Sequence, residues 1–380
     1  MIYFDNAATT NYKPQCVIDA VHLALTKFCV NAHRGTSKAS LLLEEKLAQT
    51  RQLACAVAGS NDATAVFSQN CTTALNLAIL GRAKRGGHVV VSATEHNSVL
   101  RPLMHLKNKK VIDVSVVYPD NNGQIPPQKV IDALRHNTYM VAINHVSNVT
   151  GTRQDVGTIF RAVKQVKSDV LTLCDCAQSV GYVMLDMASD KIDFVAFPTH
   201  KGLHGIQGCG VLVFANKTPP HPIVYGGTGS QSNNLLQPST LPDGLESGTL
   251  NTPAILGANA SISWWAANHK SNAQYLQKLQ QRLLDGLACI PNVTVYSQTN
   301  ASGIVAFNVK NWDSSVVGDY LSQNHDVATR SGLHCAPLMH KHLGTLNTGV
   351  VRASLSISNT TDEVDLFLSA IDDLAQKSNI

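Results

Sequence analysis

Seven short apolar runs that alternate with helix-length segments constrain the fold of this 380-residue chain most strongly. Strands of a parallel sheet are buried on both faces, so continuous apolar runs encode them, whereas a half-exposed strand alternates apolar and polar residues. The alternation therefore predicts an α/β domain with a mostly parallel seven-stranded sheet and helices on both faces. The predicted strands are Ala63–Ser68, His88–Ser92, Val111–Tyr118, Tyr139–Val146, Val170–Cys174, Ile192–Phe197 and Gly210–Phe214, and the predicted helices between them are Thr72–Leu80, Ser98–Leu106, Pro127–Arg135 and Asp155–Lys167.

A second, smaller domain is predicted after this alternation ends. A long helical pattern covers Ala254–Ala288, and strand patterns follow at Val293–Tyr296 and Gly303–Val309. A last helix is predicted at Thr361–Ala375, preceded by residues of the type that cap helices. We expect a large domain at residues 16–251 and a small α+β domain at residues 252–380, with residues 1–15 packing near the small domain.

Composition restricts the class of protein and its compartment. The net charge is only +4, and no Lys/Arg block is long enough to form a nucleic-acid or membrane surface. The N-terminus lacks the pattern of a secretory signal, and no run approaches the roughly 18 apolar residues of a membrane span. The nine cysteines are an odd number without disulfide-framework spacing, which indicates reduced thiols. These features predict a cytoplasmic enzyme without nucleic-acid or membrane partners.

A lysine and an aspartate follow two of the predicted strands. Lys201 lies in Pro198-Thr199-His200-Lys201-Gly202, just past one strand, and Asp175 ends another. Alone, such a lysine is usually a solvated charge and such an aspartate a helix cap. Together they match the needs of pyridoxal phosphate, which requires an amine for a Schiff base and a carboxylate for its ring nitrogen. Gln178, one helical turn after Asp175, is expected to bond to the phenolic oxygen of the cofactor.

Three further strand ends carry polar residues that suit the same cofactor. Cys71 and Thr72 open a predicted helix, whose first N–H groups can bind a phosphate, although many helices start this way without binding anything. His96 follows another strand, where an imidazole can stack on a ring and move a proton, although a lone histidine more often has no such role. Asn148 follows a third strand and is expected to donate to cofactor or substrate.

A cysteine and an arginine near the C-terminus suggest additional chemistry. Cys335 lies in a loop marked by Gly332 and Pro337, and neighbouring cationic groups favour its thiolate form. Arg352 carries a guanidinium that can hold a carboxylate through two hydrogen bonds. A metal site would need His334, Cys335, His340 and His342, but no second Cys/His pair completes it at usual spacing, so no metal is expected.

The chain resembles fold-type-I pyridoxal phosphate enzymes of the class V aminotransferase group, and within that group the cysteine desulfurase and selenocysteine lyase family. The resemblance covers nearly the whole chain. Tyr3–Thr10 resembles the family's opening and Asn31–Gly35 its next stretch, whereas Asp175–Gln178 and His200-Lys201 are the most specific segments. The resemblance implies a homodimer that converts L-cysteine to L-alanine and passes the sulfur, as a persulfide, to an acceptor protein.

By position, the resemblance also implies a set of site residues. Lys201 would form the Schiff base, His96 would stack on the ring, and Cys335 would carry the persulfide. Gly227 and Thr228 would reach the phosphate bound by the partner subunit. The other implied cofactor contacts are Cys71, Thr72, Asn148, Asp175, Gln178, Thr199 and His200, and the implied substrate contacts are His33, Asn148 and Arg352.

Two features distinguish this chain within the family and leave alternatives open. Pro198-Thr199 replaces the usual Ser/Thr-Gly pair before His-Lys, so Thr199 is the remaining hydroxyl near the phosphate. The short loop Arg330–Ala336 resembles the group II type, in which cysteine and selenocysteine are competing substrates. The alternatives are therefore a selenocysteine lyase, another class V lyase or aminotransferase, and a weakly active sulfur carrier or scaffold.

Overall fold

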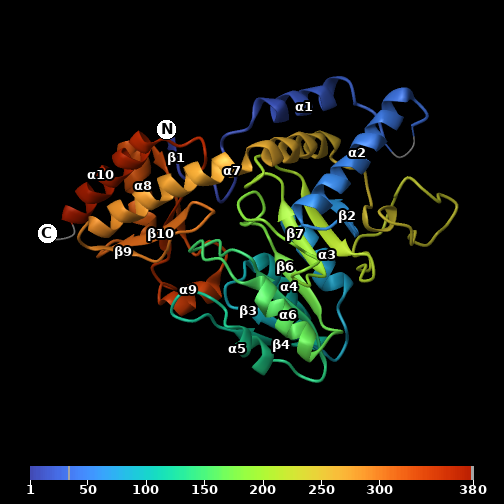
Figure 1. Ribbon diagram of the computed structural model, residues 1–380, viewed down its shortest axis with the longest axis horizontal. Coiled ribbons are helices and arrows are strands. Elements are labelled where there is room, and N and C mark those ends of the chain that lie inside the picture. Colours follow the sequence, from blue (N-terminus) through green and yellow to red (C-terminus); the bar gives the residue numbers. More distant parts are fainter. Residues whose placement is uncertain (33–34, 378–380) are drawn as a thin grey trace.

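The computed structural model describes residues 1–32 and 35–377, and its centre is a seven-stranded sheet (Figure 1). The strand order is β2-β8-β7-β6-β5-β3-β4, and all neighbours are parallel except those that involve β8, which is antiparallel to β2 and β7. The predicted fold class is therefore confirmed, with strand ends shifted by one or two residues. The strands are β2 (Ala63–Ser68), β3 (Gly87–Ser92), β4 (Ile112–Val117), β5 (Thr138–Asn144), β6 (Leu171–Asp175), β7 (Phe194–Pro198) and β8 (Gly210–Ala215).

Helices cover both faces of this sheet, because alternate residues of each strand enter different cores. In β3, for example, Val89 and Val91 pack with α3 (Cys71–Gly81) and α4 (Asn97–Asn108), whereas Val90 joins the core of the other face. That other face is covered by α2 (Lys38–Val57), α5 (Pro127–Asp132), α6 (Val156–Val166) and the first part of α7.

One long helix connects the large sheet to a second, smaller one. Helix α7 (Thr252–Cys289) has 38 residues, so at 1.5 Å per residue it is about 57 Å long. The smaller sheet is antiparallel and has the order β12-β13-β10-β9. Its strands and the helices that accompany them are β9 (Val293–Val295), β10 (Ile304–Val309), β12 (Arg330–Gly332), β13 (Val350–Ser354), α8 (Ser314–His325), α9 (Pro337–Leu343) and α10 (Thr361–Lys377).

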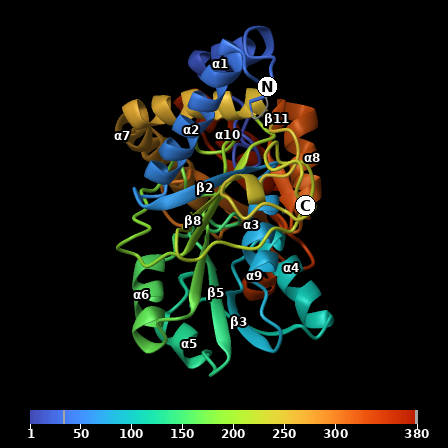
Figure 2. The ribbon, with the colours of Figure 1, turned by 90° about the vertical axis from the view of Figure 1, so that its right-hand side faces the viewer.

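The N-terminal segment lies against both parts of the molecule. Strand β1 (Ile2–Tyr3) pairs in parallel with β11 (Val327–Ala328), and Asn6 donates to the carbonyl of Ser354 at 3.0 Å. The chain then passes to the large sheet, where the N–H of Thr10 donates to the carbonyl of His200. Helix α1 (Gln15–Thr26) follows and packs along α7 (Figure 2). Within the described ranges, no helix combines the length and apolar character that crossing a membrane requires.

Candidate active site

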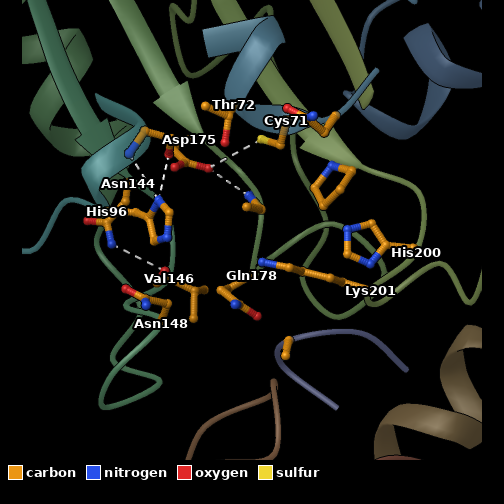
Figure 3. Close-up of a pocket in the computed structure, with 15 residues that line it drawn as sticks. Cys71, Thr72, His96, Asn144, Val146, Asn148, Asp175, Gln178, His200 and Lys201 are labelled. Carbon is orange, nitrogen blue, oxygen red and sulfur yellow. Dashed lines mark hydrogen bonds between the residues drawn. The ribbon is translucent and has the colours of Figure 1, made fainter. Parts of the chain in front are cut away.

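The carboxyl ends of adjacent strands bring several predicted residues to one cavity. In the register of the sheet, Asn144 of β5 lies beside Asp175 of β6, and Asp175 lies beside Ala196 of β7. Side chains at these ends, and in the loops just beyond them, meet at one edge. The cavity there is lined by Ala8, Asn70, Cys71, Thr72, His96, Ser98, Asn144, Val146, Asn148, Asp175, Ala177, Gln178, Pro198, His200 and Lys201 (Figure 3).

Asp175 is held at the end of β6 as a buried carboxylate. Its Oδ1 atom accepts a hydrogen bond from the N–H of Ala177 at 2.9 Å, and the Cys71 thiol lies 3.9 Å from the same atom. Burial raises the pKa of Asp175, whereas the Ala177 N–H and the charge of Lys201 act in the opposite direction. A positively charged group in the cavity would therefore stabilise the ionised form of Asp175.

Lys201 extends into the cavity from the loop after β7 (Figure 3). Burial lowers the pKa of its amine, and the nearby Cys71 and Asp175 oppose this shift. A lowered pKa increases the fraction of neutral amine, which is the form that attacks a carbonyl carbon. The position of Lys201 thus suits covalent attachment of an aldehyde.

His96 faces Lys201 across the cavity as a neutral imidazole (Figure 3). The N–H of Ser98 donates to Nδ1 of His96 at 3.0 Å, so the proton of the neutral ring is on Nε2. Burial, followed by the positive charge of Lys201, lowers the pKa of His96 to about 4. His96 caps helix α4, which explains why the chain turns at this strand end.

The start of helix α3 forms another wall of the cavity. Asn70 caps the helix by accepting from the N–H of Thr73, and Cys71 and Thr72 form the first turn. Amides in the first turn of a helix have no acceptor within the helix, and the helix dipole places positive charge there. This wall can therefore bind an anionic group such as a phosphate.

Two residues predicted to contact a cofactor are engaged with the protein itself. The Thr199 hydroxyl donates to the carbonyls of Ile206 and Cys209, each at 3.3 Å, and Thr199 is not among the residues that line the cavity. Pro198, at the end of β7, lines the cavity instead. The Gln178 side chain lines the cavity and donates to the carbonyl of Ala7 at 2.9 Å.

Cys335 lines a groove next to the cavity, and Thr72, His96 and Ser98 line both the groove and the cavity. His334 and Cys335 both have positive φ angles, 46° and 57°, which residues with a side chain rarely adopt. Two hydrogen bonds hold this backbone. The Asn148 side-chain amide donates to the carbonyl of His334 at 2.6 Å, and the backbone N–H of Asn97 donates to the carbonyl of Cys335 at 2.7 Å. The thiol is partly exposed.

Arg352 lies behind Asn148 and does not itself line the cavity. Its Nη1 atom donates to the carbonyl of Asn148 and its Nη2 atom to Oδ1 of Asp5, both at 2.9 Å. No role for Asp5 was predicted from the sequence. Nor was one predicted for Glu95, which accepts at 2.6 Å from both the Ser92 hydroxyl and the N–H of Asn144. The only signals were that Asp5 lies within the segment Tyr3–Thr10 and that Glu95 precedes His96.

The remaining predicted residues lie elsewhere. Gly227 and Thr228 belong to a loop outside the cavity of their own chain, where the N–H of Gly248 donates to the carbonyl of Gly227 at 2.8 Å. His33 lies outside the described residues. In the part of the chain that the structure describes, no three His, Cys, Asp or Glu side chains are placed to hold a metal ion.

Comparison with known proteins gives a consistent result along the whole chain. The family model described as aminotransferase class-V matches residues 2–367. A probable cysteine desulfurase of Methanothermobacter thermautotrophicus is 32% identical, over 98% of this chain and 94% of the relative. A probable cysteine desulfurase of Pyrococcus abyssi is 30% identical, over 99% of this chain and 94% of the relative. The apo structure of a cysteine desulfurase from Thermococcus onnurineus superposes with a TM-score of 0.88 at 29% identity, over 99% of this chain and 95% of the other.

Proposed function

The chain belongs to the cysteine desulfurase family of class V aminotransferases, and we propose that it converts L-cysteine to L-alanine and leaves the sulfur as a persulfide on Cys335. The observation that carries this proposal is the convergence of four groups. Asp175, Lys201 and His96 face one cavity, and Cys335 lies in the groove next to it. The first three suit pyridoxal phosphate, and the fourth supplies a thiol beside the cavity.

The cavity fits pyridoxal phosphate in its donors and acceptors. Asn148 and His200 line it and carry buried polar atoms, Oδ1 and Nδ1, that have no hydrogen-bond partner among the described residues. Buried polar atoms without a hydrogen-bond partner destabilise a protein unless a bound group forms hydrogen bonds with them. Asp175 would hold the ring nitrogen, Lys201 the aldehyde carbon, and the start of α3 with His200 the phosphate. Because Pro198 lacks a hydroxyl and that of Thr199 is engaged, α3 would provide most of the phosphate contacts.

Each residue has a distinct task in the proposed reaction. When bound, pyridoxal phosphate supplies a conjugated ring that takes up electrons released at the substrate α-carbon. Asp175 keeps the proton on the ring nitrogen, and the neutral Lys201 amine removes the proton from the α-carbon. The Cys335 thiolate attacks the substrate sulfur, forming an S–S bond as the C–S bond breaks. The β-carbon takes up the electron pair of the broken C–S bond together with a proton that the substrate thiol released, and Lys201 returns its proton to the α-carbon. These two protonations complete L-alanine, while the transferred sulfur remains on Cys335 as a persulfide.

A comparison of thiol variants tests this function. Cys335→Ala should form no alanine from L-cysteine, while it still binds pyridoxal phosphate covalently through Lys201, as borohydride reduction and peptide mass spectrometry would show. Cys16→Ala is a matched control, because Cys16 is an exposed thiol in α1, and it should keep wild-type turnover. Alanine formation by Cys335→Ala at the parent rate would show that this cysteine has only a structural role.

The same variants separate cysteine from selenocysteine as substrate. Selenium leaves carbon more readily than sulfur does, so selenocysteine should depend less on thiol attack. Cys335→Ala is therefore expected to retain part of any alanine formation from selenocysteine and none from cysteine. Equal loss with both substrates would contradict this part of the proposal.

Assembly, acceptor and compartment are further parts of the proposal. A homodimer is supported by the loop with Gly227 and Thr228, which lies outside its own cavity. Gly227 is exposed there, whereas Thr228 is buried and its hydroxyl donates to the carbonyl of Ser230. The partly exposed Cys335 would pass its sulfur to the thiol of an acceptor protein. All nine cysteines are free thiols, which fits the reducing environment of the cytoplasm.

A further inference from the structure

The guanidinium of Arg352 is almost completely buried and is held from two sides. Only 2% of the residue is exposed. On one side it donates to the backbone carbonyl of Asn148, a residue that lines the cavity. On the other side it donates to the carboxylate of Asp5. The Nε atom is buried without a hydrogen-bond partner among the described residues. Because Nε and one hydrogen on each Nη atom remain available, Arg352 can still bind a substrate carboxylate through two hydrogen bonds.

Asp5 supplies the negative charge that this buried cation requires. Arg330 lies directly opposite Arg352 in the β12–β13 pair, so a second positive charge is close by. Within the described chain, Asp5 is the carboxylate that forms an ion pair with Arg352. A buried cation without a partner would be strongly destabilised, and two adjacent guanidinium groups repel each other.

The backbone of the N-terminal segment fixes where Asp5 lies. The carbonyl of Phe4 accepts from the N–H of Ser354 at 2.7 Å, and the N–H of Asn6 donates to the carbonyl of Ser354 at 3.3 Å. These bonds flank Asp5 and form a parallel bridge between Asp5 and Ser354, two residues after Arg352. Residues i and i+2 of a strand face the same side, so this bridge places the Asp5 carboxylate beside the guanidinium.

From this arrangement, and given the proposed function, we infer that Asp5 is a positioning residue for substrate recognition. It fixes the plane of the Arg352 guanidinium so that the unused N–H groups are presented to the α-carboxylate of the amino-acid substrate. Asp5 touches neither the cavity nor the reacting atoms. Its loss should therefore weaken the binding of carboxylate-bearing ligands and leave the chemical steps unchanged.

Asp5→Asn tests this inference with the pyridoxal phosphate-loaded enzyme. The amide keeps the shape and one acceptor but loses the charge, so KM for L-cysteine should rise about tenfold while kcat changes less than about twofold. Asp5→Glu should restore part of the lost affinity. Binding of L-cysteine and of cysteamine, which has the same amine and thiol but no carboxylate, is measured by the change in cofactor absorbance on a Cys335→Ala background. Only the binding of L-cysteine should weaken.

Asp326→Asn is the matched control for a purely structural effect. Asp326 also holds the N-terminal segment, through an ion pair of 2.8 Å with the amino group of Met1, but it does not contact Arg352. This variant should leave KM and both binding constants unchanged. The inference is overturned if Asp5→Asn weakens cysteamine and L-cysteine equally, if it lowers KM, or if Asp326→Asn has the same effect. Failure of the proposed function would look different, because the wild-type enzyme would form no alanine.

Discussion

Asp175 shows how strongly a single buried charge depends on its partner. It is 5% exposed, and burial alone raises the pKa of its carboxyl group. The Ala177 N–H and the Lys201 charge favour the ionised form, and a protonated pyridine nitrogen would favour it further. Asp175 is therefore matched to a cationic ligand that is deeply enclosed.

Replacing Asp175 by Asn tests this match. The amide has nearly the same shape but no charge, so it cannot stabilise a protonated ring nitrogen. We expect pyridoxal phosphate to bind at least tenfold more weakly and alanine formation to fall by two or more orders of magnitude. Equilibrium dialysis and turnover at saturating cofactor would measure the two effects separately. Wild-type turnover in Asp175→Asn would refute the proposed role of this carboxylate.

Whether a residue of the candidate site could be predicted depended on where its contacts lie along the chain. Asp175 ends a buried strand and His96 follows another after a short loop. Parallel strand ends meet at one edge of a sheet, so local patterns were sufficient to bring these residues together. Asp5 was missed because its role depends on Arg352, 347 residues away. Thr199 was placed near the phosphate by resemblance, but only the fold shows its hydroxyl bonded to backbone carbonyls.

At the scale of elements, the cavity depends on how closely strand β8 approaches helix α3. Gly210 begins β8, and a Cβ atom on it would lie 2.2 Å from the carbonyl carbon of Asn70 and 2.6 Å from the nitrogen of Cys71. These are backbone atoms, so they cannot rotate away as a flexible side chain can. The absence of a side chain at Gly210 therefore allows α3 to begin at the cavity wall.

Gly210→Ala should displace the start of α3. We expect a loss of about 1–3 kcal/mol in the free energy of unfolding, together with weaker binding of pyridoxal phosphate. Urea unfolding and cofactor titration measure these two quantities. Gly226→Ala is a control for stability, because the nearest atom to a new Cβ there is 3.9 Å away. Unchanged cofactor affinity in Gly210→Ala would argue against α3 as part of the cofactor site.

The elements that could be predicted from sequence are those with a strong local pattern. Four strands of the large sheet, β3, β5, β6 and β7, are fully buried, so apolar residues predominate in their sequences. Strand β12 (Arg330–Gly332) has no buried residue and depends on its pairing with β13, so no local pattern reveals it. The predicted helix Pro127–Arg135 also ends earlier, at Asp132.

Across the whole molecule, His204 joins three segments that are far apart in the sequence. Its ring lies 6.0 Å from that of Tyr12 in the N-terminal segment and 5.5 Å from that of Trp264 in α7, between ring centroids. Its Nδ1 atom is 3.1 Å from the carbonyl of Tyr12, which identifies Nδ1 as the donor. The ring is 3% exposed, and burial lowers the pKa of His204 to about 4. This contact is therefore most stable when the imidazole is neutral.

Lowering the pH should weaken the contribution of His204 to stability, and a variant that does not titrate can measure this change. Since the folded pKa of about 4 is below the ordinary value of 6.5, the unfolded chain binds the extra proton first as pH falls. The stabilisation is thus fully present above pH 6.5 and is lost as pH falls towards 4. His204→Asn can still donate to Tyr12 but does not titrate, and asparagine tolerates the left-handed backbone at this position, where φ is 61°.

The free energy of unfolding of the wild type, relative to His204→Asn, should therefore decrease by up to about 3 kcal/mol between pH 7 and pH 4.5. Urea unfolding at several pH values measures this difference, with the exposed His105→Asn as a control. A difference that stays constant with pH would show that His204 joins these segments by packing alone.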